Sequence, residues 1–402
     1  KSYHKSMAKV ITEEIKIQEL LTRSVEKIFP SKEFLEQRLK SGGELSLYLG
    51  IDPTGPDLHL GHSVQLFVLK RFQDLGHKVI IVIGDFTAQI GDPTGKDLTR
   101  KPLSEKEVKE NAKRYKNQIA KILDIGRTDF KYNSSWLGRL NFKDVVKLGT
   151  FKTVQQLLDR DMFQRRIAEE KSIGVHEFLY PLMQGYDSVA MKIDGEVGGS
   201  DQTFNMLVGR DLEKAYLKKE KFVLTTRLLT DPKTGKKMMN KSEGDYISLK
   251  DEPQDMYAKI LSLPDEAVFE IFELCTDVQT EKIDHLKSES ILAAKHELAY
   301  EITKIYHSEK EALRAREEFV RVFSNKEEPT EMPEFSGVGM MLLDFMIKSG
   351  LTESRSEAKQ LIEQGAVRIN KEVIKIRNQW NYELREGDII QVGPRKFVKI
   401  IK

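Results

Sequence analysis

The sequence predicts a doubly wound α/β domain on a parallel sheet, followed by a helical region and a small basic domain. The first part is indicated by an uninterrupted apolar strand at 79–83 and a strand-like run at 45–51, joined by an amphipathic helix. A strand without polar alternation is covered on both faces, as is typical of parallel sheets. A stretch at 324–335 with two prolines and four glutamates reads as a linker before the last domain.

Length and composition limit the classes of function that are possible but do not identify one. The 402 residues, 39% of them apolar, suffice for two or three domains. Lysine and arginine number 65 against 63 acidic residues, so the net charge of +2 neither demands nor excludes a polyanionic partner. Cys275 is the only cysteine, which excludes internal disulfides and cysteine-based metal clusters. With no apolar run near the roughly 18 residues of a membrane span and no signal-peptide core, we expect a cytoplasmic protein without a membrane partner.

The remaining elements follow from hydrophobic spacing. Helices are expected at 8–40, at 104–123 and at 151–171, and a short strand at 130–132. A further helix is expected to carry His59 and His62 at its start and to end at Gly76. Met162 and Phe163 are candidates for a subunit interface. Helical spacing returns from 253 to 323, and residues 341–402 carry 12 basic and 8 acidic residues, a net charge of +4.

The stretch from Tyr48 to His62 predicts a phosphate site. A strand, a glycine-containing turn and a helix start follow one another there, and helix N-termini expose unpaired N–H groups that bind anions. His59 and His62 are three residues apart, so both can face one ligand and donate to phosphate oxygens. A structural or capping role is the common alternative. A metal site is weakly supported, because there is no H-E-x-x-H pattern or acidic third ligand.

The turn-rich segment 84–96 follows the buried strand. It lacks the spacing of a phosphate-binding P-loop, since no glycine stands five residues before Gly95 and Asp97 follows Lys96. It reads either as a plain turn cluster or as part of a ligand site, because α/β sheets bind ligands at the carboxyl ends of their strands. Asp92 in this segment could hold a substrate ammonium group.

Tyr180, Gln184 and Asp187 are spaced i, i+4, i+7 and would share one helix face. Pro181 favours a helix that begins at Pro181 with Tyr180 as its cap, since the residue before proline avoids helical dihedrals. These side chains suit a small polar molecule with an aromatic body, and an ordinary surface helix is the alternative.

Two further segments carry polar groups. Gly199, Asp201 and Gln202 form a glycine turn with side chains able to bind ribose hydroxyls. Residues 231–242 form a lysine-rich loop containing Lys237 and Lys241, which is either a solvated loop or a mobile one that closes over a triphosphate.

Together these motifs resemble a known family. His59-Leu60-Gly61-His62 resembles the "HIGH" signature of class I aminoacyl-tRNA synthetases, and Met238-Met239-Asn240-Lys241-Ser242 resembles their "KMSKS" loop, with Met238 at the first lysine position and Lys237 one step earlier. Over nearly its whole length the chain resembles tyrosyl-tRNA synthetases of bacterial or organellar type. Tryptophanyl-tRNA synthetases share the Y-P-L-M…D frame, but they typically carry phenylalanine, glutamine, asparagine and methionine at the positions of Tyr48, Asp52, His62 and Gln184.

The resemblance implies a role for each motif residue. Tyr48 and Asp187 would hold the phenolic hydroxyl of tyrosine, and Tyr180, Gln184 and Asp92 its ammonium group. The residues implied to border ATP and the adenylate are Gly50, Asp52, Gly61, Gly199, Asp201 and Gln202. Those implied to act on the phosphates are Thr54, His59, His62, Lys237 and Lys241.

The resemblance also implies the domain plan: N-terminal helices (1–40), a Rossmann-like catalytic domain (41–230), a mobile loop (231–245), a helical anticodon-recognition domain (246–323), a linker (324–337) and a C-terminal α+β RNA-binding domain (338–402). Residues 342–373 resemble a small RNA-binding module shared with a small-subunit ribosomal protein and some pseudouridine synthases. Its implied phosphate contacts are Arg355, Lys359 and Arg368.

The implied activity is ATP-dependent joining of L-tyrosine to the 3′-terminal ribose of tRNA(Tyr) through tyrosyl-adenylate. ATP would enter with Mg²⁺, no tightly bound protein-liganded metal is expected, and a homodimer is expected. Two alternatives stay open: activation of tryptophan, and a non-catalytic RNA-binding or splicing-type protein on the same scaffold. The intact His59, His62, Lys241, Asp92 and Asp187 disfavour the second alternative.

Overall fold

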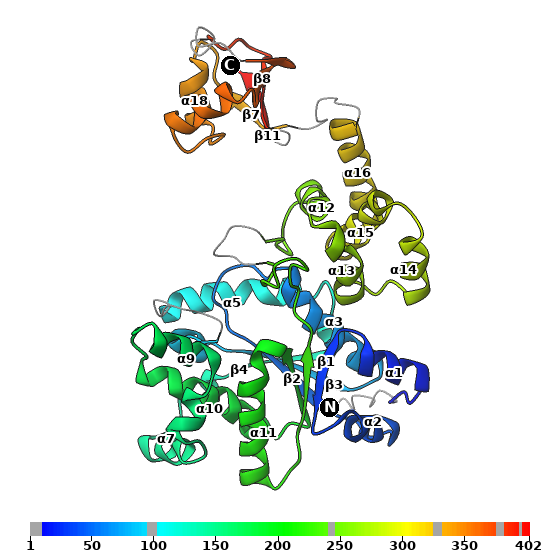
Figure 1. Cartoon of the computed structure of the whole chain (residues 1–402), viewed down its shortest axis with the longest axis vertical. Helices are drawn as coiled ribbons and strands as arrows, with labels where there is room; N and C mark the ends of the chain where they lie inside the picture. The colour runs from blue at the N-terminus through cyan, green and yellow to red at the C-terminus, as the bar shows by residue number, and fades with distance from the viewer. Residues whose placement is uncertain (1–9, 95–102, 240–245, 325–331, 375–381, 394–395) are drawn as a thin grey trace, which may run out of the picture. The chain divides into compact units, whose positions relative to one another are not determined.

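The computed structural model describes residues 10–94, 103–239, 246–324, 332–374, 382–393 and 396–402 (Figure 1). It divides into two compact units, residues 1–312 and 313–402, which we describe separately. Within the described residues, no helix is long and apolar enough to cross a bilayer.

The first unit is built on a six-stranded sheet. The strands are β1 (Val25–Phe29), β2 (Ser46–Ile51), β3 (Lys78–Ile83), β4 (Thr128–Tyr132), β5 (Gly195–Gly199) and β6 (Phe222–Thr226). Their order is β1-β6-β5-β2-β3-β4, and all neighbours are parallel except β1 and β6. From β2 the chain winds outward to β3 and β4, and from β5 it winds the other way to β6. The predicted doubly wound parallel sheet is confirmed, and its winding direction changes between β2 and β5.

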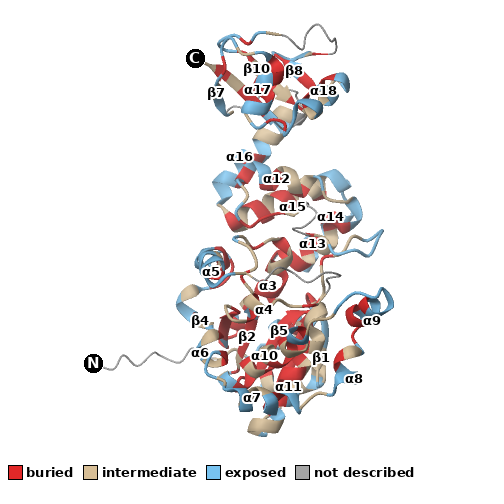
Figure 2. Cartoon of the chain, turned by 90° about the vertical axis from the view of Figure 1, so that its left-hand side faces the viewer, coloured by how far each residue is buried: buried red, intermediate tan, exposed pale blue. Residues whose placement is uncertain are grey.

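Helices cover both faces of this sheet. Helix α3 (Leu60–Asp74) connects β2 to β3, and α11 (Thr203–Leu217) connects β5 to β6. Because the two connections run in opposite directions and such crossovers are right-handed, the two helices lie on opposite faces. Helix α10 (Val175–Met191) packs along α11, and the strands between these layers are largely buried (Figure 2).

Two strands lie where the sequence gives little strand signal. Strand β5 contains three glycines, and a Cβ on Gly195 would come within 2.0 Å of the Phe222 ring. This strand therefore depends on close approach of its neighbours, which propensity does not reveal. Strand β1 interrupts the helices expected at 8–40, which are α1 (Glu14–Thr22) and α2 (Lys32–Lys40). It is a partly exposed edge strand, held by pairing with β6.

Helix α10 does not begin at Pro181, so that prediction is wrong. It begins at Val175, where the Glu177 carboxylate accepts from the Gly174 N–H at 2.7 Å and pairs with buried Arg166 at 2.6 Å. Proline costs one backbone hydrogen bond inside a helix, but its fixed φ is compatible with helical geometry. The start fixed by Glu177 and the packing on α11 outweigh that cost. Tyr180 is thus a residue of the helix and not its cap.

The other helices of the catalytic region are α4 (Thr87–Ile90), α5 (Glu105–Ile119), α6 (Ser134–Leu137), α7 (Phe142–Gly149), α8 (Val154–Leu158) and α9 (Asp161–Ala168). The expected helix at 151–171 is therefore divided into α8 and α9. Met162 and Phe163 are 5% and 0% exposed, so they belong to the core and not to a subunit interface. The helical region consists of α12 (Pro253–Leu261), α13 (Val268–Cys275), α14 (Thr280–Lys287), α15 (Ile291–Tyr306) and α16 (Glu309–Phe319).

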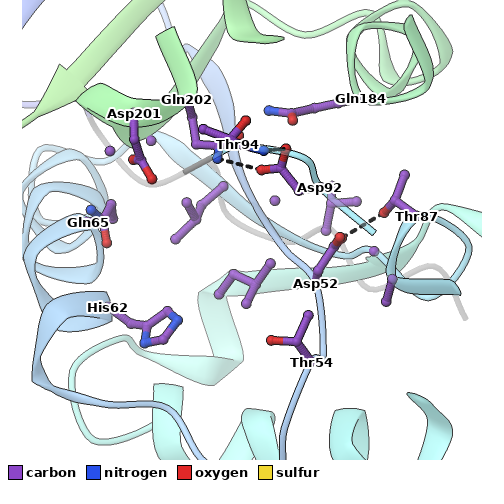
Figure 3. Close-up of a pocket in the computed structure, with 18 of the residues that line it drawn as sticks. Asp52, Thr54, His62, Gln65, Thr87, Asp92, Thr94, Gln184, Asp201 and Gln202 are labelled. Atoms are coloured by element: carbon purple, nitrogen blue, oxygen red, sulfur yellow. Dashed lines mark hydrogen bonds between the residues drawn. The ribbon is translucent and has the colours of Figure 1, made fainter. Parts of the chain in front are cut away.

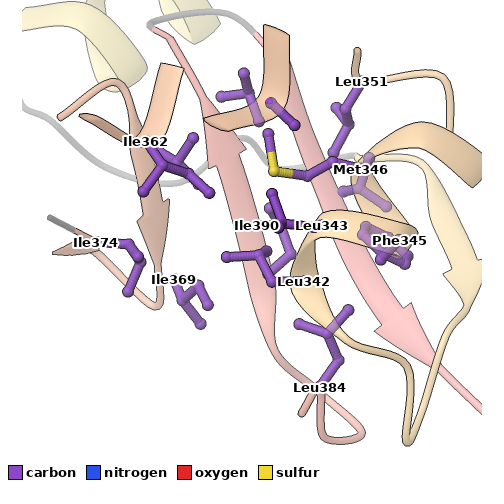
Figure 4. Close-up of a cluster of buried hydrophobic side chains, with 14 of the residues drawn as sticks. Leu342, Leu343, Phe345, Met346, Leu351, Ile362, Ile369, Ile374, Leu384 and Ile390 are labelled. Carbon is purple, nitrogen blue, oxygen red and sulfur yellow. The ribbon is translucent and has the colours of Figure 1, made fainter. Parts of the chain in front are cut away.

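The second unit is a small α+β domain. Its strands β7 (Glu334–Ser336), β8 (Val367–Ile369), β9 (Glu372–Val373), β10 (Ile389–Val392) and β11 (Lys396–Ile401) form a sheet of order β7-β11-β10-β8-β9. Helices α17 (Leu342–Lys348) and α18 (Arg355–Glu363) cover it. Leu342, Phe345, Ile362 and Ile390 are fully buried between helices and sheet (Figure 4). The domain thus has an apolar core of its own.

Candidate active site

A cavity of the first unit opens at the carboxyl ends of β2 and β5, where the winding of the sheet changes direction. This is the position at which open α/β sheets bind ligands. Its volume is about 760 Å³ (Figure 3). The predicted site residues that line it are Gly50, Asp52, Thr54, His59, Gly61, His62, Asp92, Tyr180, Gln184, Asp187, Gly199, Asp201, Gln202 and Lys237.

Asp52 links two elements at the floor of the cavity. Its carboxylate accepts from the Thr87 hydroxyl at 2.7 Å and from the Tyr180 hydroxyl at 2.8 Å. Burial raises the pKa of Tyr180 well above its ordinary value, and the Asp52 and Asp92 carboxylates raise it further. Tyr180 therefore stays protonated and remains a donor to Asp52. A Cβ on Gly84 would lie 1.9 Å from the Asp52 Oδ1, so this carboxylate needs the glycine beside it.

Asp92 lies on the side of the cavity opposite His62 and Thr54 in the view of Figure 3. One carboxylate oxygen accepts from Gln202 Nε2 at 2.8 Å and the other from the Thr94 backbone N–H at 2.9 Å. Buried Arg160 donates to the Thr94 hydroxyl at 2.8 Å. Gln202 thus orients Asp92 directly, a contact that sequence reasoning missed when it assigned Gln202 to ribose.

Asp187 is buried at the inner end of the cavity. Its carboxylate accepts from Trp136 Nε1 at 2.7 Å and from Asn133 Nδ2 at 3.5 Å. Burial raises the pKa of Asp187 well above its ordinary value, while the two hydrogen bonds oppose that shift. Nearby, Gln184 Nε2 donates to Glu196 Oε1 at 3.2 Å.

Tyr48 is fully buried and is not among the residues that line the cavity. Its hydroxyl lies 3.1 Å from the Ser188 hydroxyl. Burial raises the pKa of Tyr48 well above its ordinary value, and the Glu196 and Asp187 carboxylates add to this effect. The Tyr48 hydroxyl is therefore a neutral, protonated group. It lies close to the inner end of the cavity.

The two histidines lie at the start of α3, as predicted. His59 is the N-cap in extended conformation, and its backbone N–H donates to His62 Nδ1 at 3.1 Å. The ring centroids are 3.9 Å apart, and a Cβ on Gly61 would lie 3.1 Å from the His59 ring. The histidine pair therefore makes a capping contact and also faces the cavity, so a capping role and a phosphate-binding role are compatible.

Helix α5 supports the turn between β2 and α3. Asn111 donates to the Pro53 carbonyl at 3.0 Å and Tyr115 to the Gly55 carbonyl at 2.8 Å. These contacts fix the turn that carries Thr54, and no local pattern in the sequence connects them.

The described part of the lysine-rich segment, residues 231–239, forms a turn whose end lines the cavity. Thr230 and Lys237 form an antiparallel bridge, and the Met238 N–H donates to the Leu229 carbonyl at 2.8 Å. Lys237 Nζ lies 2.6 Å from Asp201 Oδ2, and both side chains line the cavity. Lys241 lies outside the described residues.

The predicted RNA contacts belong to the second unit. Arg355 and Lys359 are one turn apart on α18, and Arg355 pairs with Asp344 at 3.3 Å. Arg368 is exposed on β8. These residues are not among those that line the cavity of the first unit.

Five polar residues on the cavity wall were missed by sequence reasoning: Gln65, Thr87, Thr94, Asn133 and Glu196. Asn133 directly follows β4 and Thr87 comes four residues after β3, so the carboxyl-end rule applied to every strand would have found them. Gln65 lies one turn after His62 on α3, and no signal in the sequence marks Glu196.

Comparisons with known proteins agree with this geometry. The family model for class I tRNA synthetases (W and Y) matches residues 40–324, and the model of the S4 domain matches residues 341–390. The tyrosine–tRNA ligase of Carboxydothermus hydrogenoformans is 46% identical over 402 residues, covering 95% of this chain and 97% of that protein. Tyrosine–tRNA ligase 2 of Clostridium acetobutylicum is 43% identical over 98% of this chain and 99% of that protein.

A solved structure agrees in fold. The C-terminally truncated mitochondrial tyrosyl-tRNA synthetase of Coccidioides posadasii has a TM-score of 0.62 and 26% identity to this chain, covering 75% of this chain and 91% of that chain.

Proposed function

The chain belongs to the tyrosine–tRNA ligase family of class I tRNA synthetases, and on that premise we propose how its cavity carries out the two steps of the reaction. The enzyme is a ligase that forms an aminoacyl-tRNA, with ATP as a substrate. The assignment of roles rests on one observation: the histidine pair lines the same cavity as Tyr180, Gln184 and Asp187.

We assign the inner end of the cavity to tyrosine. Asp187 and Tyr48 lie where a phenolic hydroxyl would be bound, and Tyr180, Gln184 and Asp92 surround the position of its ammonium group. Trp136 and Asn133 hold the Asp187 carboxyl in place. Phenylalanine would leave these buried polar groups unpaired, which is the strongest available basis for rejecting it.

We assign the outer end to ATP. The N–H groups of His59 and His62 and the ammonium group of Lys237 supply donors and positive charge for the phosphates, and Thr54 lies beside them. Asp52, Gly50, Gly61, Gly199, Asp201 and Gln202 border the nucleotide. The Lys237–Asp201 pair is partly exposed and therefore weak, so the lysine can exchange Asp201 for phosphate at little cost.

The chemistry then needs no side-chain nucleophile. The tyrosine carboxylate oxygen attacks the α-phosphorus of ATP, an O–P bond forms, and pyrophosphate leaves with the electrons of the broken bond. A terminal ribose hydroxyl of the tRNA next attacks the acyl carbon, and AMP leaves. Because the carboxylate is already nucleophilic, the protein contributes positioning and electrostatic stabilisation. Mg²⁺ would accompany ATP and would supply positive charge to its phosphates, beside the donors of His59, His62 and Lys237.

We further propose that the chain forms a homodimer and that tRNA(Tyr) contacts the helical region and the basic second unit. Five large apolar side chains between residues 142 and 175 are exposed, which favours a partner surface there: Phe142, Val146, Val154, Ile167 and Val175. Sedimentation of the purified chain at micromolar concentration should give twice the 46.3 kDa of one chain, and the chain mass alone would contradict the dimer.

Pyrophosphate exchange with tyrosine and tryptophan tested in parallel examines the substrate. Tyrosine should support exchange between pyrophosphate and ATP, and tryptophan should not. Exchange that depends on tryptophan would instead indicate an enzyme that activates tryptophan. An absence of exchange with either amino acid would favour a non-catalytic RNA-binding protein. In the same assay, Lys237→Ala should slow exchange about tenfold or more without weakening tyrosine binding.

A further inference from the structure

Lys221 is a fully buried cation behind the inner end of the cavity. It directly precedes β6, and its side chain is 0% exposed. The ammonium group donates to Glu196 Oε2 at 2.5 Å and to Ser188 Oγ at 2.7 Å, and it lies 5.8 Å from the centre of the Tyr48 ring. Removing a lysine and a glutamate from water is costly, and apolar side chains could fill the same space without that cost. The pair therefore calls for a role beyond packing.

Two chains of hydrogen bonds lead from Lys221 to residues assigned to tyrosine. The first runs through Ser188 to the Tyr48 hydroxyl, 3.1 Å away. The second runs through the Glu196 carboxylate, whose other oxygen accepts from Gln184 Nε2 at 3.2 Å. One chain thus ends at the residue assigned to the substrate hydroxyl, and the other at a residue assigned to the ammonium group.

The chemistry of the ammonium group gives the first chain a direction. Lysine has donors only, so it occupies a lone pair of the Ser188 oxygen and favours donation of the serine proton to Tyr48. The Tyr48 oxygen then accepts, and its own proton is left to donate, either to the nearby Glu196 carboxylate or, when tyrosine is bound, to the substrate oxygen. In the second chain, the fixed carboxylate of Glu196 holds the Gln184 amide with its oxygen turned away from Glu196.

We propose that Lys221 is a positioning residue for tyrosine recognition, acting through Ser188 on Tyr48 and through Glu196 on Gln184. This inference rests on the assignment of the inner cavity to tyrosine made above. Its consequence is selectivity, because phenylalanine offers no oxygen to a Tyr48 hydroxyl that has been oriented to donate.

A purely structural ion pair makes a different prediction. If Lys221 only joins β6 to β5 and α10, its removal lowers stability without changing the preference between tyrosine and phenylalanine. The ratio of the two kcat/KM values, measured in amino-acid-dependent pyrophosphate exchange, separates the two roles. The KM for ATP serves as an internal reference, because neither chain of hydrogen bonds reaches the phosphate side.

The test uses the full chain with Lys221→Met and with the double variant Lys221→Met, Glu196→Gln. Lys219→Met is the matched control, because Lys219 pairs with Asp194 at 3.1 Å away from the cavity. Lys221→Met should raise the KM for tyrosine and lower the preference over phenylalanine, each about tenfold or more, with the KM for ATP unchanged. The double variant should recover part of the loss, because it no longer contains an uncompensated buried carboxylate. Lys219→Met should match the wild type.

A folded Lys221→Met variant that keeps the wild-type preference would overturn the proposal, as would a double variant no better than the single one. If Lys221→Met does not fold, Ser188→Ala replaces it as the test, because this variant interrupts only the chain of hydrogen bonds to Tyr48. A lowered preference for tyrosine over phenylalanine would support the proposal, and an unchanged preference would refute it. A wild-type chain without tyrosine-dependent exchange would instead refute the proposed assignment of the cavity, so the two failures are distinguishable.

Discussion

At the scale of single residues, the cavity depends on carboxylates that are fixed by specific donors. Asp52, Asp92 and Asp187 each accept two hydrogen bonds, at least one of them from another element. Such contacts hold a group in one orientation before the ligand arrives, which is how binding geometry is prepared without movement. The residues that supply these donors matter as much as the carboxylates themselves.

Gly84→Ala tests this dependence at Asp52. The added Cβ would lie 1.9 Å from Asp52 Oδ1 and 2.4 Å from the Thr87 hydroxyl, so the carboxylate must move. We expect kcat/KM for tyrosine in pyrophosphate exchange to fall by about tenfold to a hundredfold, and stability to fall by about 1–3 kcal/mol.

Gly149→Ala is the matched control, because a Cβ there meets nothing within 4 Å. It should leave exchange unchanged. Wild-type kinetics for Gly84→Ala would show that the position of Asp52 does not matter.

The sequence identified most residues of the cavity but few of their mutual contacts. Motif spacing found His59 and His62 because both lie at one helix start, and it found Tyr180, Gln184 and Asp187 because helical periodicity puts them on one face. The bond from Gln202 to Asp92 joins residues 110 positions apart, and no local pattern encodes it. Long-range partners of this kind require the fold.

At the scale of elements, the same limit applies. The apolar run of β3 predicted a buried strand. Strand β5 contains glycines because neighbouring side chains fill the space that a Cβ would need, such as the Phe222 ring at Gly195 and Met206 at Gly198. Helix α10 continues through Pro181 because its start and its packing outweigh one lost hydrogen bond. Local propensity fails where tertiary contacts dominate.

Helix α11 carries a buried acid that predicts a pH effect. Glu213 is fully buried, and burial raises its pKa from 4.5 to about 7. Because the folded-state pKa is raised, the unfolded chain ionises first, and stability falls as the pH rises from about 4.5 to about 7. Glu213→Gln should remove this loss of unfolding free energy, which is about 3 kcal/mol. The stability of the variant relative to the wild type should therefore increase as the pH rises across that range.

Chemical denaturation of the wild type and Glu213→Gln at several pH values measures this difference. A constant difference in unfolding free energy between pH 4.5 and 8 would contradict the raised pKa. If Glu213→Gln were more stable than the wild type only at low pH, the pH dependence would have the opposite sign, which would also contradict the raised pKa.

At the scale of the whole molecule, the two units divide the substrates. The cavity of the first unit is proposed to activate tyrosine, and the basic face of the second is proposed to bind the tRNA backbone. Each unit has buried apolar residues of its own. The proline- and glutamate-rich stretch at 324–335 predicts a linker, and the boundary between the two units lies before it, at 312/313.

A triple variant, Arg355→Ala with Lys359→Ala and Arg368→Ala, tests this division. Removing up to three phosphate contacts should raise the KM for tRNA and reduce the slope of log affinity against log salt by up to about 0.7–0.9 per contact. Pyrophosphate exchange without tRNA should be unchanged. Unaltered tRNA affinity and salt slope would remove these residues from the interface.

The central claim is that buried polar groups at the inner end of the cavity select tyrosine by its hydroxyl. The most direct measurement compares tyrosine and phenylalanine in pyrophosphate exchange for the wild type, Tyr48→Phe and Asp187→Ala. The account predicts a strong wild-type preference for tyrosine that falls by at least about tenfold in each variant, because the partner of the hydroxyl is lost. A preference that stays at the wild-type value in both folded variants would contradict it.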